Sequence, residues 1–134
     1  MKAFGYVIGA VVVVFLLIVI VANSQNPTGS DAVYFAKKRV SELMKDPSST
    51  EFKSVEFFPS TQNQKEEIYG FVCGFVNAKN SFGAYTGFNR FHMNITVSNN
   101  GRSATMSPPL IEDPASSSSP DLFDNFWKEN CQKK

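Results

Sequence analysis

Two cysteines, Cys73 and Cys131, have the widest choice of chemistry in this chain. Thiols can form a disulfide, act as a redox pair or bind a metal ion. The sequence contains no CxxC motif, and its single histidine is too few to complete a metal site. Two cysteines in a small exported domain most often form one disulfide. We therefore expect a structural Cys73–Cys131 bond and no metal or other cofactor, with a redox pair or a metal site as the alternatives.

His92, the one histidine, is the next candidate for chemistry. It lies among the outward-facing residues of an alternating stretch, so we expect a solvated or hydrogen-bonding role. No Ser, Asp or Cys stands at a spacing that pairs with it for nucleophilic catalysis. Glu66 and Glu67 are adjacent and would face opposite sides of a strand, which makes a poor acid–base pair. The sequence therefore predicts a protein that is not an enzyme, with an envelope hydrolase as the weakest alternative.

The segment from Cys73 to Phe91 combines amides, a lysine and aromatic rings around Gly83 and Gly87. Glycines permit positive φ, so the chain can fold back tightly between two strands. Aromatic rings beside amide side chains favour a recognition surface for a peptide, a glycan or a protein. The alternative is a simple strand connection whose rings enter the core and whose amides close turns. The candidate contact residues are Asn77, Lys79, Asn80, Phe82, Tyr85 and Arg90.

Residues 31–134 must position these side chains as one domain of about 100 residues, near the usual domain size. Apolar spacing predicts helices over 31–45 and 120–131, where Leu122, Phe123, Phe126 and Trp127 form an apolar face. Ser30 or Asp31 can cap the first helix, and Asp46–Pro47 ends it. Strands are predicted at 51–58, 68–77 and 88–98, and an Asn100–Gly101 turn leads to an edge strand over 102–106. The fold class is α+β: a small domain with a three- or four-stranded antiparallel sheet, one N-terminal helix and one C-terminal helix.

Residues 3–22 form an uninterrupted run of uncharged, mainly apolar residues after Lys2. Such a run reaches roughly 30 Å as a helix, the thickness of the hydrocarbon core of a bilayer. We therefore expect residues 1–24 to be a transmembrane helix or signal anchor, followed by a linker at 25–30. The alternative is a cleaved signal peptide with a cleavage site at Ala22-Asn23-Ser24.

We expect a single-pass membrane protein with its C-terminal domain in an oxidising compartment outside the cytosol. Basic residues at 37–39 favour the reverse orientation, whereas the expected disulfide favours export. Without Lys2, the chain has twelve basic and twelve acidic residues, because the totals are 13 and 12. A neutral domain argues against nucleic acid as a partner. The expected partners are the membrane, through residues 3–22, and a protein of the envelope.

Two motifs, Lys45–Phe52 (KDPSSTEF) and Cys73–Phe91 (CGFVNAKNSFGAYTGFNRF), resemble those of small uncharacterised bacterial envelope proteins. Those proteins carry KDPSSxxF and CGxVNAKNSFGxYxGFxxF patterns and are often associated with phages or mobile elements. The resemblance implies an exported or membrane-anchored bacterial protein, so the expected location is the bacterial inner membrane, with a single pass and the C-terminal domain in the periplasm. It brings no established activity and no catalytic residue, and this chain lacks the lipid-accepting cysteine of similar lipoproteins.

Together these observations favour a membrane-anchored periplasmic binding protein. Phage exclusion and toxin immunity are two roles that would suit a protein from mobile elements. The alternative function is a structural accessory subunit of a larger membrane or envelope assembly, since Gly5, Gly9 and Ala10 would allow close helix approach.

Overall fold

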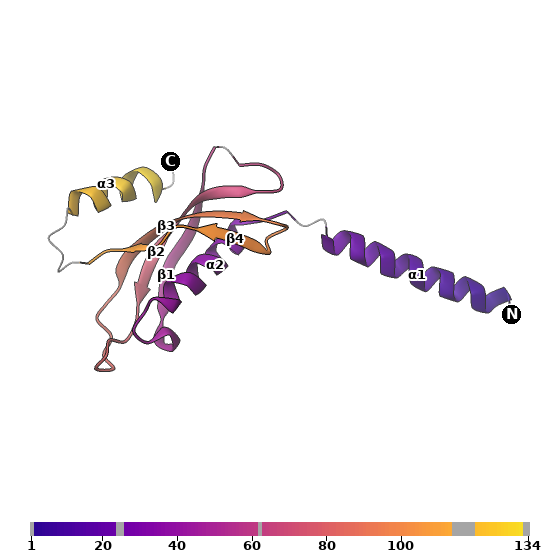
Figure 1. Cartoon of the computed structure of the whole chain (residues 1–134), viewed down its shortest axis with the longest axis horizontal. Coiled ribbons are helices and arrows are strands. Elements are labelled where there is room, and N and C mark those ends of the chain that lie inside the picture. The colour runs from indigo at the N-terminus through magenta and orange to yellow at the C-terminus, as the bar shows by residue number, and fades with distance from the viewer. Residues whose placement is uncertain (1, 24–25, 62, 114–119, 133–134) are drawn as a thin grey trace.

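An antiparallel sheet forms the centre of the computed structural model, which describes residues 2–23, 26–61, 63–113 and 120–132 (Figure 1). Its strands are β1 (Glu51–Pro59), β2 (Ile68–Asn77), β3 (Asn89–Ser98), β4 (Ser103–Met106) and β5 (Leu110–Ile111). Helix α2 (Gly29–Glu42) packs on one face, here called the core face, and α3 (Pro120–Asn130) on the other, the outer face. Helix α1 (Lys2–Asn23) projects away from the sheet. The α+β class with an antiparallel sheet is confirmed, but the described residues form five strands in place of the predicted three or four, because Leu110–Ile111 adds a short fifth strand beside β3.

The strand order is β1-β2-β3-β4, and β5 pairs with the same edge of β3 as β4 does. β4 pairs with Ile95–Ser98, and β5 pairs with Phe91 and His92. The predicted strand 68–77 has the observed bounds, and the strands predicted at 51–58 and 88–98 each differ by one residue. Asn100 and Gly101 both have positive φ, at 57° and 77°, as the predicted turn requires.

Helix α2 covers the core face through small side chains, since Ala32, Ala36 and Val40 are all completely buried. They pack against the inward side chains of β2 and β3. The helix begins two residues before the predicted start and ends three residues before the predicted end. Its N-cap is Thr28 in place of the predicted Ser30 or Asp31, and Asp31 closes a capping box by accepting a hydrogen bond from the Thr28 backbone at 2.8 Å.

Strand β1 contains a bulge that keeps Phe52, Val55 and Phe57 on the core face. Lys53 pairs with Phe75 and Glu56 with Cys73, so Ser54 and Val55 together face Gly74. Ser54 has φ 47°, which is uncommon outside glycine. The extra residue places Phe52, Val55 and Phe57 against the core. The same shift sends Glu56 and Phe58 to the outer face, beside their partners Cys73 and Phe71.

The expectation of a membrane span is corrected here. Across the described residues, we find no helix with both the length and the apolar character that a membrane crossing needs. The structure therefore does not support a transmembrane helix at 3–22, a single-pass topology, membrane contact through these residues or an inner-membrane location with a periplasmic domain. The proposed cleavage after Ser24 and the serine-rich stretch 114–119 lie outside the described residues.

Candidate functional site

Residues 78–88 connect β2 to β3 as a small hairpin, which we call the recognition hairpin. Lys79 and Tyr85 form an isolated antiparallel bridge at its base. At its tip, the Gly83 N–H donates to the Asn80 carbonyl at 2.9 Å, and Gly83 adopts φ 78°. The Asn80 side-chain oxygen accepts from the backbone N–H groups of Phe82 and Ala84, at 2.9 and 3.1 Å. One asparagine therefore fixes the shape of the tip.

The recognition hairpin is hydrogen-bonded to the short 3-10 helix η1 (Pro47–Ser49), whose N-cap is Asp46. The Lys79 N–H donates to the Ser49 hydroxyl at 2.9 Å, and the Tyr85 hydroxyl donates to the Ser49 carbonyl at 3.1 Å. Ser49 in turn donates its hydroxyl to the Asp46 carbonyl at 2.8 Å. The two sequence motifs thus meet at one end of the sheet, where Ser49 links them.

Charges surround Tyr85 at this junction. The Lys79 ammonium lies 5.6 Å from the Tyr85 ring centre, which is a cation–π contact. Desolvation raises the Tyr85 pKa, and the nearby carboxylates of Glu51 and Asp46 raise it further. A hydrogen bond from the Ser48 side chain lowers the Asp46 pKa. The tyrosine therefore stays neutral and keeps its hydroxyl as the donor that Ser49 requires.

Phe82 stands at the tip of the recognition hairpin with 94% of its surface exposed. Other aromatic side chains of the 78–88 connection are held at its base. Tyr85 is 44% exposed and bonded to Ser49, and the Phe88 ring lies 4.0 Å from the Lys53 ammonium. A large apolar ring in water on a tightly braced turn has no evident role in folding. It is the feature of this site that favours binding.

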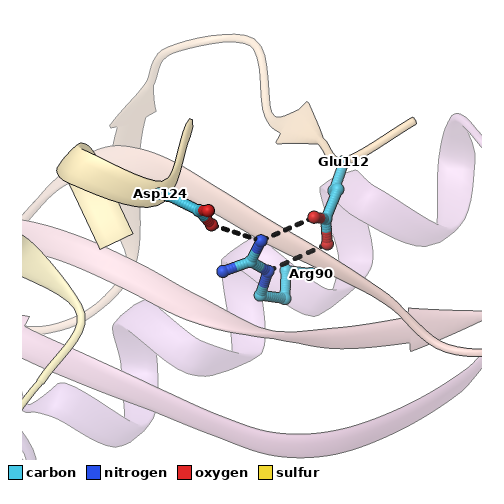
Figure 2. A network of polar contacts seen from close by, with 3 residues as sticks. All are labelled: Arg90, Glu112 and Asp124. Carbon is cyan, nitrogen blue, oxygen red and sulfur yellow. Dashed lines mark hydrogen bonds and ion pairs between the residues drawn. The ribbon is translucent and has the colours of Figure 1, made fainter. Parts of the chain in front are cut away.

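Two of the six predicted contact residues have other surroundings. Asn77 is buried, and its side-chain oxygen accepts from the Gly87 N–H at 3.1 Å, so it closes the base of the connection. Arg90 lies on the outer face, where it binds both oxygens of Glu112 at 2.5 and 2.9 Å and Asp124 of α3 at 2.6 Å (Figure 2). Lys79, Asn80, Phe82 and Tyr85 are the predicted residues that the recognition hairpin brings together.

Arg90 joins three elements and is itself held tightly. Its hydrogen bonds to Glu112 raise its pKa despite partial desolvation, and Asp124 raises it further. The guanidinium also lies 5.0 Å from the Phe123 ring centre and 5.4 Å from that of Trp127. The hydrogen bonds from Arg90 lower the Glu112 pKa. This cluster fixes α3 and β5 to β3.

The outer face beneath α3 is aromatic and closed by the disulfide. Cys73 and Cys131 are bonded, as predicted, and both are buried. The His92 ring stacks on Phe126, with ring centres 3.8 Å apart. His92 is 5% exposed, so of the two expected roles, solvated or hydrogen-bonding, the solvated one is wrong. It was inferred from the alternation of β3 alone, which does not reveal that α3 covers the outward residues.

Among the described residues, no group of three or more His, Cys, Asp or Glu side chains is arranged to hold a metal ion. No known protein family, curated protein or solved structure matches this chain. The functional argument therefore depends on the geometry of the recognition hairpin. Sequence reasoning missed Ser49 as part of this site, although it lies within one of the two motifs, because its partners are about 30 residues away in the chain.

Proposed function

We propose that this chain is a non-catalytic binding module that recognises a protein partner through the recognition hairpin. The proposed contact surface consists of Lys79, Asn80, Phe82 and Tyr85. The observation that carries the proposal is the combination of a fully projecting Phe82 with a tip braced by Asn80 and Ser49. A braced loop loses little conformational entropy on binding, which is a common way to gain affinity.

Phe82 would supply most of the binding energy of this surface. Burying a phenylalanine side chain contributes about 1.5–3 kcal/mol, and residues of this kind at the centre of an interface often act as hot spots. Lys79 and the amide of Asn80 lie in the same hairpin and can supply the polar rim. A protein partner with an apolar pocket fits this arrangement better than a glycan, because Phe82 is a 94% exposed apolar ring that a pocket can enclose, while the neighbouring Tyr85 is held by Ser49.

Site-specific photocrosslinking tests the proposal. The full chain is produced, in cells of the organism that encodes it, with a photoreactive benzophenone amino acid at position 82. The matched control carries the same group at Leu122, which is 71% exposed on α3. We expect a crosslinked adduct of one discrete mass from position 82 and none from position 122.

Competition makes the result specific. Excess wild-type chain should suppress the adduct, whereas Phe82→Ala and Asn80→Ala chains should compete at least about tenfold less well. Phe82→Ala should leave the unfolding midpoint unchanged because the ring makes few contacts within the chain. Equal adducts at both positions, or full competition by Phe82→Ala, would remove the recognition hairpin from consideration. Phage exclusion and toxin immunity, which the motif resemblance suggests, are the settings in which we propose to look first for the partner.

A further inference from the structure

Helix α1 presents an apolar surface that the described part of the chain leaves exposed. The helix projects away from the sheet (Figure 1), and its large apolar side chains from Tyr6 to Val19 are each between 40% and 78% exposed. No charged residue lies in this stretch. A helix that is apolar on every face is normally buried, and an exposed apolar surface of this extent marks an interaction site. The shape of α1 indicates which partner covers it.

A groove on α1 has the form of a hole in a coiled coil. It is lined by Ala10, Val11, Val14, Phe15 and Ile18. The last four stand at positions i, i+3, i+4 and i+7, so they surround one spot on the helix surface. In a coiled coil, each helix inserts side chains as knobs into holes that four residues of the facing helix form. The groove on α1 is therefore shaped to receive one side chain of another helix.

The groove lies on a longer stripe of residues with heptad spacing, which we call the α1 seam. Its described members follow one another at intervals of four, three and four residues: Val7, Val11, Val14 and Ile18. This alternation is the spacing of a and d positions, and in the sequence Phe4 and Val21 continue it at either end. Because α1 is apolar on every face, spacing alone could not select this stripe. The groove selects it, since three members of the seam line the groove.

We propose that α1 packs against α1 of further copies of this chain in a parallel coiled-coil bundle, with the α1 seam at its centre. A second copy fits the groove because the seam supplies both parts of the contact: the hole and, in the same register, Val14 as the knob that enters it. A seam that is β-branched at both a and d is typical of bundles with more than two helices. Such bundles cover more of a helix that is apolar on every side. Between Tyr6 and Val19, α1 has no charged side chain with which to select a different protein.

Cysteine crosslinking in cells that produce the full chain tests this arrangement. The two native cysteines are bonded to each other, so a cysteine introduced into α1 supplies the free thiol. The cells are treated with copper phenanthroline, and disulfide-linked dimer is measured on non-reducing gels. We expect Val11→Cys, Val14→Cys and Ile18→Cys to give at least about fivefold more dimer than the matched controls, because equivalent seam residues meet across a parallel bundle. The controls are Val12→Cys and Leu16→Cys, which the helical period places away from the seam.

A charge placed in the seam provides an independent test. In the Val11→Cys chain, Val14→Lys should reduce the dimer at least about tenfold, because like charges would meet inside an apolar contact. Leu16→Lys, the matched control, should leave the dimer unchanged, and neither lysine should change the urea unfolding of the domain, from which α1 projects away. The proposal is overturned if no position gives dimer, if seam and control positions crosslink equally, if Leu16→Cys gives the most dimer, or if Leu16→Lys removes the dimer as Val14→Lys does. None of these outcomes depends on the recognition hairpin.

Discussion

His92 shows how a single side chain can couple the stability of this fold to pH. Burial beneath α3 lowers its pKa from the ordinary 6.5 to about 4. The folded protein therefore favours the neutral ring, whereas the unfolded chain protonates it below about pH 6.5. The stability that the neutral ring provides is complete above that pH and is lost as the pH falls towards 4.

We expect the free energy of unfolding to fall by about 2 kcal/mol between pH 7 and pH 5 because of this residue. Urea denaturation at the two pH values measures the change. Carboxylates also titrate in this range, so the comparison is with His92→Phe, which keeps an aromatic ring between Phe123 and Phe126. The contribution is refuted if the variant and the wild type lose the same stability on acidification.

At the scale of residues, the sequence predicts what a side chain can do better than it predicts which other residues surround that side chain in the fold. The Cys73–Cys131 pair followed from the number of cysteines, and Asn80 and Phe82 were singled out from their neighbours. Arg90 was assigned to the contact surface because it is close to the hairpin in sequence, yet strand alternation turns it to the outer face. Its partners Glu112 and Asp124 are 22 and 34 residues away, so no local pattern could have indicated them.

The bulge in β1 and the strand β2 beside it form an element on which the core depends. A Cβ atom at Gly74 would lie 2.8 Å from a Val55 methyl carbon and 2.9 Å from its Cα. Backbone cannot move aside as a side chain can, so Gly74→Ala should destabilise the domain by about 2 kcal/mol. Thermal or urea unfolding measures this loss.

The same substitution elsewhere provides the control. Gly9 lies in α1, where a methyl group added to it would have nothing within 4 Å, and alanine favours helix. Gly9→Ala should leave the unfolding of the domain unchanged. If a Gly74→Ala chain unfolds at the wild-type midpoint, then β1 can shift without loss of stability. The close contact between Gly74 and Val55 would then contribute nothing to the free energy of unfolding.

At the scale of elements, the sequence was most informative where one physical rule acts alone. β2 is apolar on both faces and has its predicted bounds because it is covered by helices on both sides. β1 was less regular, since Phe52, Val55 and Phe57 are spaced by three and then two residues, and a bulge was not foreseen. In α3, Leu122 was placed on the apolar face but is 71% exposed, whereas Phe123, Phe126 and Trp127 do contact the sheet or Arg90.

For the whole molecule, the disulfide is the covalent link between α3 and the outer face, in addition to the Arg90 cluster and the aromatic contacts. It closes a loop with a sequence separation of 58, for which chain entropy predicts about 4 kcal/mol of stabilisation. Reduction should therefore lower the free energy of unfolding by about that amount. Hydrogen exchange should speed up first in α3, since the core face is held by α2 without the bond.

A Cys131→Ala chain is the control for the reducing agent. It should match the reduced wild type and should not respond to reductant. If reduced wild type keeps both its stability and the protection of α3, then the aromatic contacts and Arg90 alone hold the helix.

The class of the fold and the order of its elements were predictable from local periodicity and turn residues. The location of the protein was not, because the apolar composition of residues 3–22 suggested a span that the described part of α1 does not support. The expected disulfide placed the C-terminal helix on the sheet, but the burial of His92 beneath it was missed. Alternation in a strand distinguishes two faces but does not say which of them meets solvent.

Ser54 also matters for recognising distant relatives of this protein. The strand holds one residue more than its neighbour can pair with, so a chain lacking that serine would keep the same ladder of partners on both sides of it. Homologues without the bulge would then differ by a gap in the middle of a strand, where alignment procedures resist placing one. Searches that allow a single deletion between Lys53 and Val55 should recover such homologues more readily than searches that confine gaps to loops.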